Sequence, residues 1–181
     1  MTMTDIKTAP TTAPSIVPKF DSEDKGRKLA IICSKGNLDM AYPGLILGNA
    51  ALGEGIDTHL FFTFWGFDMI IKTRMEHLQF SPAGNTALHL PGTDMHIPQA
   101  MAPAMTGMAT NMLKKQISSL GIPDIPDFLD QIVASGGHLW ACRLSADMNK
   151  VDEHDLRDDV EGIISASDFI EMAEGAQLLF I

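Results

Sequence analysis

Short apolar runs recur along the chain from residue 28 onward, and polar or glycine-containing stretches separate them. Runs of this length are typical of strands that are covered on both faces, as in a parallel sheet. We expect such strands at residues 28–33, 58–63, 138–142, 160–163 and 178–181. The first two are joined by a segment long enough for one helix and two short loops, which indicates a right-handed parallel crossover.

Helices are expected between these strands, where apolar residues repeat every three or four positions. The first helix runs through the apolar residues 45–51 and ends at Gly53 or Gly55. Pro43 is placed in its first turn, where a missing N–H costs least. Further helices are expected at residues 67–77, 109–120 and 125–134, with a short acidic helix near Asp152.

A capping-box variant marks the start of the last helix. Ser165 is followed three residues later by Asp168, which takes the place of the usual Glu or Gln. Ile164 and Phe169 are spaced as the accompanying hydrophobic staple, and the helix is expected to end near Gly175. Residues 78–108, by contrast, contain several prolines and glycines, and we expect no regular helix through the whole of this segment.

The N-terminal residues differ in composition from the rest of the chain. They are rich in Thr, Pro and charged residues, and such a segment cannot bury a core. We expect residues 1–27 to form a flexible tail, or an arm that docks on a neighbouring subunit. Residues 28–181 are expected to form a single α/β domain, since the chain of 181 residues with 45% hydrophobic content can bury a sizeable core.

The net charge, the first residues and the cysteine count indicate which partners and which compartment to expect. A formal net charge of −10 disfavours nucleic acid as a partner and suits a basic protein instead. The first residues lack the apolar core of a signal peptide, and no run approaches the ~18 apolar residues of a membrane span. Two cysteines do not make a disulfide framework. We therefore expect a cytoplasmic protein with no stable membrane span.

Cys142 is the leading candidate for chemistry. It ends an apolar run and precedes a helix or turn, so the thiol is expected at the C-terminal edge of the sheet. Backbone N–H groups, a helix start and the adjacent Arg143 would favour the thiolate, which is the reactive form. The alternative is an inert structural cysteine, because free cysteine is among the most buried residue types.

Cys33 and the loop after it belong to the same predicted edge of the sheet. Cys33 ends the first strand, so it is either a second thiol of the site or a structural thiol. In the loop, the backbone around Gly36, Asn37 and Asp39 either holds an anion or simply starts a helix. The loop lacks both nucleotide-binding glycine patterns, and we expect no cofactor.

The histidines and methionines give weaker signals. None of the six histidines has the spacing of a tight metal signature, and no metal ion is expected; His89 and His96, near Asp94, are interpreted as solvated loop side chains. The methionine-rich segment 95–112 either packs in the core or forms a surface for a partner or another subunit. An exposed apolar patch of this length predicts a homo-oligomer.

Three stretches of the chain form a combination that is typical of one family. They are residues 61–66, the methionine-rich middle, and the pattern Ala141-Cys142-x-x-Ser145-x-x-Met148. With these stretches the chain resembles the DsrE/DsrF-like sulfur-trafficking family, within the DsrE-like branch associated with rhodanese and TusA-type carriers. The family often has Gly-Asp-x-Asp-Lys after its first strand; this chain has Gly36-Asn-Leu-Asp-Met, which keeps Asp39 and lacks the lysine. Some members carry a cysteine in the middle segment, where this chain has none.

The resemblance implies a three-layer α/β/α fold with a mostly parallel sheet of about five strands, usually oligomeric. It also implies that the cysteine matching Cys142 carries sulfane sulfur or a thiosulfonate group and passes it to an acceptor thiol, in TusA-type or rhodanese-type partners. Arg143 and Ser145 would then stabilise the anion. The alternative function is an assembly or partner-binding subunit of a sulfur-metabolism complex, in which the thiol stays inert.

Overall fold

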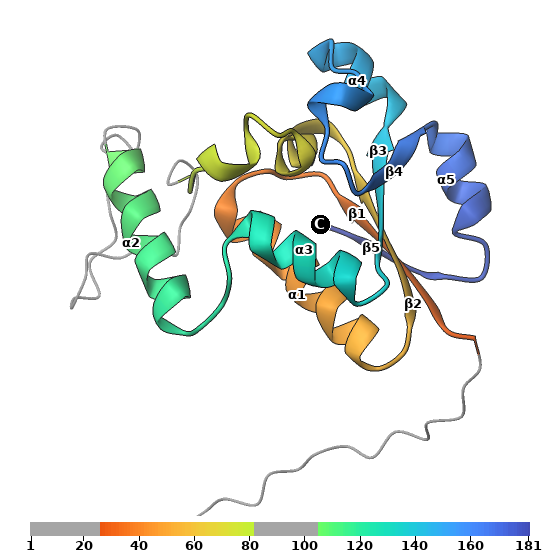
Figure 1. The fold of residues 1–181 in the computed structure, drawn as a ribbon, viewed down its shortest axis with the longest axis horizontal. Helices are drawn as coiled ribbons and strands as arrows, with labels where there is room; N and C mark the ends of the chain where they lie inside the picture. The colour runs from red at the N-terminus through yellow and green to blue at the C-terminus, as the bar shows by residue number, and fades with distance from the viewer. Residues whose placement is uncertain (1–25, 82–104) are drawn as a thin grey trace, which may run out of the picture.

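A five-stranded parallel sheet forms the centre of the molecule. The computed structural model describes residues 26–81 and 105–181. The strands are β1 (Lys28–Cys33), β2 (Asp57–Phe62), β3 (His138–Cys142), β4 (Val160–Ile164) and β5 (Gln177–Phe180), in the spatial order β4-β3-β2-β1-β5 (Figure 1). Every neighbouring pair is parallel. The five strands predicted from the apolar runs are confirmed, each within about one residue at either end.

Helices cover both faces of the sheet, as the resemblance implied. The α-helices are α1 (Leu38–Gly53), α2 (Thr106–Ser119), α3 (Ile125–Ala134), α4 (Arg143–Asn149) and α5 (Ala166–Met172). Helices α1 and α3 lie on one face and bury the larger core, which includes Leu45, Leu129 and Ile132. Helix α5 covers the other face, where Phe169 stacks on Phe61 with ring centroids 4.4 Å apart (Figure 1). The fold is therefore a three-layer α/β/α arrangement.

The predicted start of the last helix is confirmed in atomic detail. The Ser165 hydroxyl accepts a hydrogen bond from the Asp168 N–H at 3.2 Å, and the Asp168 carboxylate accepts one from the Ser165 N–H at 2.9 Å. This reciprocal pair satisfies two N–H groups that the first turn leaves without partners. The same hydrogen bonds lower the pKa of the Asp168 carboxyl.

The prediction for the first helix was wrong at its start. Helix α1 begins at Leu38, so Pro43 lies in the helix interior and not in the first turn. An interior proline removes one hydrogen bond to the carbonyl four residues earlier. Burial of Leu38, Ala41 and Tyr42 in this extra turn offsets that loss, and the Leu38 N–H is satisfied by the Gln79 carbonyl at 3.0 Å.

The prediction of one helix at residues 67–77 was also wrong. The chain there forms two 3₁₀ segments, η1 (Phe64–Ile70) and η2 (Met75–His77). Between them Ile71 is extended and forms an antiparallel bridge with Leu156, which takes the chain out of the helical conformation. The acidic segment near Asp152 is likewise a 3₁₀ turn, η5 (Glu153–Asp155), and not an α-helix.

Several predictions concern residues outside the described part of the chain. These are the tail up to residue 25, the segment with His89, Asp94 and His96, and the first part of the methionine-rich segment up to residue 104. Helix α2 contains residues 106–112 of that segment and starts at Thr106, three residues before the predicted position. Among the described residues, no helix is long and apolar enough to cross a membrane.

Candidate functional site

Cys142 lies where strand β3 ends and helix α4 begins. It is the last residue of the strand and the N-cap of the helix. The N–H groups of Leu144 and Ser145, in the first turn of α4, are within hydrogen-bonding reach of its sulfur atom. The placement expected from the sequence, a thiol at the C-terminal edge of the sheet just before a helix, is therefore confirmed.

The hydrogen bonds to Cys142 determine its ionisation. The residue is only 5% exposed, and burial alone would raise the pKa of its thiol. The Thr63 hydroxyl, the Ser145 N–H and hydroxyl, and the Leu144 N–H all favour the thiolate. Together they outweigh burial and hold the pKa of Cys142 below its ordinary value. The site therefore favours a reactive thiolate despite its small exposed area.

Ser145 connects the thiol to the end of the neighbouring strand. Its side chain is buried, and its hydroxyl oxygen lies 3.3 Å from the Thr63 hydroxyl oxygen. The same oxygen accepts a hydrogen bond from the Phe64 N–H at 2.7 Å. Because the Phe64 N–H occupies a lone pair, the hydroxyl proton of Ser145 is free to point towards Cys142 or Thr63.

A strained backbone follows Thr63. Phe64 has φ +48°, in the left-handed region that bulky residues rarely adopt. The hydrogen bond from the Phe64 N–H to Ser145 holds this conformation, and the next turn packs closely because Gly66 has no side chain. A Cβ atom at Gly66 would lie 2.1 Å from the Cys33 carbonyl oxygen. The strain thus positions η1 against the thiol site.

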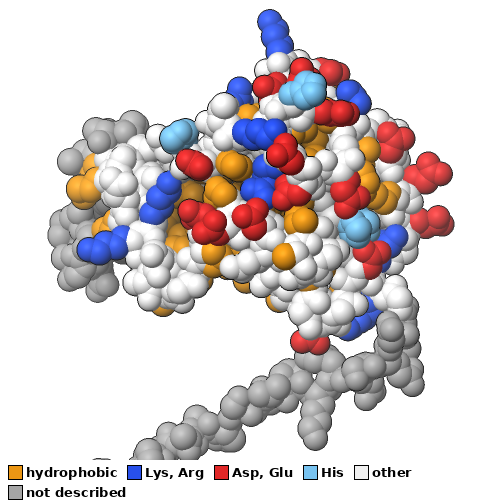
Figure 2. Space-filling model, viewed as in Figure 1, with side chains coloured by type: hydrophobic (Ala, Val, Ile, Leu, Met, Phe, Trp, Pro, Cys, Tyr) orange, Lys and Arg blue, Asp and Glu red, His pale blue; other side chains and the backbone are white. Residues whose placement is uncertain are grey.

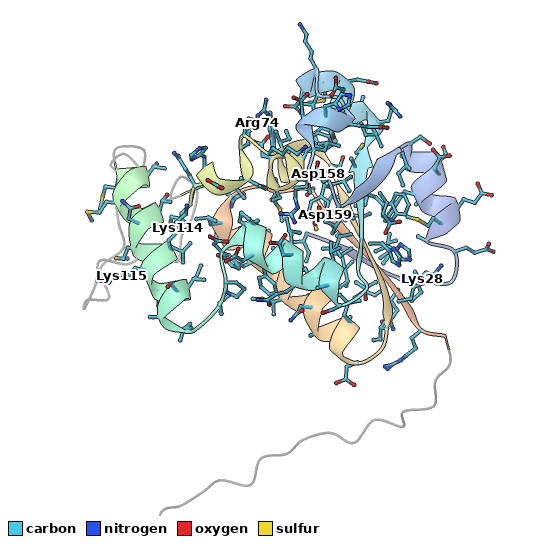
Figure 3. The ribbon with its side chains drawn as sticks, viewed as in Figure 1. Lys28, Arg74, Lys114, Lys115, Asp158 and Asp159 are labelled. Atoms are coloured by element: carbon cyan, nitrogen blue, oxygen red, sulfur yellow. The ribbon has the colours of Figure 1, made fainter. Side chains whose placement is uncertain are left out.

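A chain of polar contacts supports α4 from the other side. The Asn149 amide donates to the Ser145 carbonyl at 2.8 Å, and Arg74 donates to the Asn149 side-chain oxygen at 2.9 Å. Arg74 also pairs with Asp68 on η1 at 2.8 Å. Figure 3 shows Arg74 between η2 and α4. These contacts fix the helix that carries Ser145 relative to η1.

Arg143 does not face the thiol. Its side chain is exposed, and its guanidinium donates to the Ile163 carbonyl of β4 at 2.9 Å. Among the groups that influence the pKa of Cys142 are Thr63, Leu144 and Ser145, but not Arg143. Of the two side chains expected to stabilise the anion, the structure brings Ser145 to the sulfur and directs Arg143 to β4.

Cys33 lies at the same edge of the sheet but on its other face. Its sulfur belongs to the core beneath α1, whereas Cys142 belongs to the core beneath α5. Strand β2 lies between their strands, so the two are about 10 Å apart across the sheet as well. Burial raises the pKa of Cys33 to about 12. Direct exchange of sulfur between the two cysteines has no support in this arrangement.

The loop with Gly36, Asn37 and Asp39 contacts η1 and not Cys142. A Cβ atom at Gly36 would lie 2.2 Å from the Trp65 carbonyl oxygen, so the glycine permits this close approach. Asn37 donates to Asp39 at 2.6 Å at the start of α1. The loop borders a groove of about 630 Å³ that Lys35, Trp65 and Arg74 also line. Its contribution to the site is thus to support Trp65.

Sequence reasoning missed Thr63, although a signal for it was present. The register pairs Phe62 with Ala141, so the residue after Phe62 is level with Cys142 at the same edge. Alternation along β2 then places Thr63 on the face shared by Phe61 and Cys142. A hydroxyl residue directly after a strand that neighbours the cysteine strand was the available indication.

One other cluster has side chains of the kind that bind metals. Among the described residues, Asp57, His59 and His138 bring three such ligand atoms within 4.8 Å of one another. They lie at the N-terminal end of β2 and β3, far from the thiol. No short sequence motif connects them, because they come from two strands that are distant in the chain.

Comparison with known proteins gives one family and several relatives. The DsrE/DsrF/DrsH-like family matches residues 25–181. The sulfur carrier protein DsrE2 of Allochromatium vinosum is 33% identical over 150 residues, which cover 81% of this chain and 92% of that protein. The uncharacterized protein YrkE of Bacillus subtilis is 24% identical over 168 residues, which cover 87% and 99% respectively.

Two solved structures have the same fold. One is the protein of unknown function MTH1491 from Methanobacterium thermoautotrophicum, with a TM-score of 0.51 and 9% identity. The other is the ychN protein of E. coli, with a TM-score of 0.50 and 13% identity. Each match covers 86% of this chain and 99% of the solved one. At these identities the likeness concerns the fold alone.

Proposed function

Since the chain belongs to the DsrE/DsrF/DrsH-like family, we propose that it is a sulfur carrier that holds sulfane sulfur or a thiosulfonate group on Cys142. The observation that carries this proposal is the set of hydrogen bonds that favours the Cys142 thiolate in spite of burial. The similarity to a sulfur carrier protein over most of both chains supports it.

The proposed reaction is a pair of thiol exchanges. The Cys142 thiolate attacks the outer sulfur of a donor persulfide, a new S–S bond forms, and the donor leaves as a thiolate with the electron pair of the broken bond. An acceptor thiolate then attacks the outer sulfur of the Cys142 persulfide, and the Cys142 thiolate is restored. Thr63, Leu144 and Ser145 would stabilise both the thiolate and the persulfide anion, since each donates a hydrogen bond to negative charge.

The surroundings of the thiol suit delivery to a protein. Four large apolar side chains on η1 and α4, the two elements that hold the site, are exposed: Phe64, Trp65, Leu144 and Met148. Trp65 is 62% exposed. Exposed apolar residues beside a nearly covered thiol favour a partner that docks there and brings its own thiol to the sulfur. We propose TusA-type or rhodanese-type carriers as such partners, in the cytoplasm.

Loading of sulfur tests the proposal directly. The native chain is incubated with polysulfide or tetrathionate, and intact mass spectrometry measures the sulfur added. Wild type and Cys33→Ser are expected to gain the adduct, and Cys142→Ser is expected to lose it. Equal loading of wild type and Cys142→Ser would refute the carrier function and favour the assembly subunit with an inert thiol.

A further inference from the structure

A group of ionisable side chains lies at the opposite end of the sheet from Cys142. His59 and His138 are register partners on β2 and β3, and Asp57 lies two residues before His59, on the same face of its strand. Their imidazole rings stack with centroids 4.6 Å apart and planes 16° apart. This is the face that α5 covers farther along the strands.

The distances within the group are close to those of ligands around one metal ion. Nε2 of His59 lies 3.1 Å from Oδ1 of Asp57, and Nε2 of His138 lies 3.7 Å from the same oxygen. Ligand atoms about 2.0–2.1 Å from a tetrahedral zinc ion are about 3.3 Å from one another. The two distances to the carboxylate lie on either side of that value, and all three ligand atoms lie within 4.8 Å of one another, so side-chain rotations would bring them around one ion.

The Nε2 atom of His59 is a buried polar atom without a hydrogen bond. His59 is 8% exposed, and among the described residues its Nε2 has no well-formed hydrogen bond, although Oδ1 of Asp57 lies 3.1 Å away. Buried polar atoms without partners are rare in proteins and call for an explanation. A metal ion bound between Nε2 and the Asp57 carboxylate would give both groups a partner.

Glu161 supplies the second-layer contact that metal-binding histidines usually have. Its carboxylate pairs with Nδ1 of His138. A proton on Nδ1 would leave the Nε2 lone pair, on the side of Asp57, for a metal ion. The pairing of β3 with β4 is irregular between Leu139 and Trp140, and this irregularity leaves Glu161 without a register partner. Bulges of this kind redirect a side chain, and here the carboxylate reaches His138.

Two side chains next to the cluster, Trp140 and Lys28, would change their contacts when an ion binds. The Trp140 indole N–H donates to Nδ1 of His59 at 3.2 Å, so a metal on Nε2 would place the proton on Nδ1 and break that bond. Lys28, on the side of α5 in Figure 3, lies 3.9 Å from the second Asp57 oxygen and also donates to the Met172 carbonyl at 3.2 Å. It can keep the carbonyl contact when the carboxylate turns to the metal.

We propose that Asp57, His59 and His138 form a binding site for a divalent transition metal ion such as Zn²⁺. Two imidazoles and one carboxylate are a ligand set that this class of metal accepts, with a remaining position for water. Asp57 and His138 are partly exposed, which leaves a route for the ion. Cys142 lies four residues beyond His138 on β3, about 13 Å away, so the thiol is not a ligand and the site is separate from sulfur transfer.

Titration of the full chain with Zn²⁺, followed by calorimetry, tests the proposal. We expect one strong site per chain that His138→Ala weakens at least ten-fold. His154→Ala, on the exposed turn η5, is the matched control and should bind as wild type does. Glu161→Gln should weaken binding within the range of about 10–100-fold seen for second-layer partners. His138 is partly exposed, so the variant is expected to fold, and circular dichroism checks this.

A spectroscopic measurement locates the ion independently. Co²⁺ bound at this site should quench the fluorescence of Trp140, whose indole contacts His59. Trp65→Phe should keep the quenching and Trp140→Phe should lose it. Equal Zn²⁺ affinity of His138→Ala and His154→Ala, or loss of binding in Cys142→Ser instead, would overturn the proposal. Neither result would affect the sulfur-loading experiment, which depends on Cys142 alone.

Discussion

The hydroxyl oxygen of Ser145, on helix α4, lies 3.3 Å from the hydroxyl oxygen of Thr63, at the end of strand β2. Both hydroxyls are within reach of the Cys142 sulfur, and both favour its thiolate. The Phe64 N–H donates a hydrogen bond to the same Ser145 oxygen and fixes the orientation of the serine. The ionisation of the thiol therefore depends on contacts between two segments that are distant in the sequence.

Replacement of Thr63 by valine is expected to slow the alkylation of Cys142. The variant keeps the shape of the side chain and removes one hydrogen bond to the thiolate. A hydrogen bond to a charged group contributes about 1.5 kcal/mol or more, and about 1.4 kcal/mol is ten-fold in an equilibrium. The rate with iodoacetamide at pH 7 should therefore fall about ten-fold, as measured by mass spectrometry of the native protein.

The pH dependence of the alkylation rate shows in which direction the Thr63 hydroxyl shifts the pKa of Cys142. The alkylation rate rises with pH as the thiol ionises, and in wild type the midpoint should lie below that of an ordinary cysteine, since the pKa of Cys142 is lowered. Thr63→Val should move the midpoint to higher pH. Thr58→Val is the matched control, because among the described residues that hydroxyl bonds to the Ile56 carbonyl and not to the thiol. An unchanged midpoint in Thr63→Val would count against the role of the hydroxyl.

Cys33 is expected to be unreactive in the native fold. With a pKa of about 12, only about one thiol in ten thousand is ionised at pH 8. Alkylation of Cys142→Ser should therefore require unfolding, whereas Cys33→Ser should react as wild type does. Peptide mapping after a timed treatment with iodoacetamide measures both. Rapid labelling of Cys33 in the folded protein would contradict the burial that the structure shows.

The fold was predictable because its signals are local. Apolar runs indicate the strands, and the Ser165 and Asp168 pair marks a helix start through contacts three residues apart. The errors arose where tertiary contacts dominate. Ile71 is drawn into a bridge with Leu156, and Pro43 is held inside α1 by burial of the turn before it.

The candidate site was predictable only in part, for the same reason. The position of Cys142 follows from its strand and the helix after it. The positions of Thr63 beside Cys142 and of His59 beside His138 depend on the register of β2 against β3. That register is set by tertiary pairing and cannot be read from the sequence. The expectation that Arg143 assists the thiol rested on sequence adjacency, whereas its side chain extends to β4.

Arg157 is expected to be important for stability. It is 8% exposed and pairs with Asp130 on α3 and with Asp159, at 2.6 Å, near the start of β4. Figure 3 shows Asp159 beside α3. Arg157→Met removes charged hydrogen bonds and leaves two carboxylates close together, but Asp130 is largely exposed and can be rehydrated. We expect a loss of about 2–3 kcal/mol in the free energy of unfolding.

Urea denaturation measures that loss, and Arg143→Met is the control. Arg143 is exposed, and within residues 26–81 and 105–181 its side chain makes one hydrogen bond, to the Ile163 carbonyl. Substitutions at exposed positions of this kind usually change stability by about 0.5 kcal/mol or less. Equal midpoints for the two variants would show that the buried arginine contributes no more than the exposed one.

Helix α2 is expected to take part in a homo-oligomer. Its described residues include Met108, which is 60% exposed, and Met112, and Figure 2 shows hydrophobic side chains on the surface in this region. Large apolar groups that gather on a surface usually mark an interface, and methionine adapts to the shape of a partner. Light scattering at micromolar concentration should give a mass above that of the monomer, and Met108→Glu should shift it towards the monomer because it places a charge in the interface.

Ile170→Glu, on α5 and equally exposed, is the matched control and should leave the mass unchanged. A monomeric wild type, or an equal shift in both variants, would exclude α2 as the contact surface.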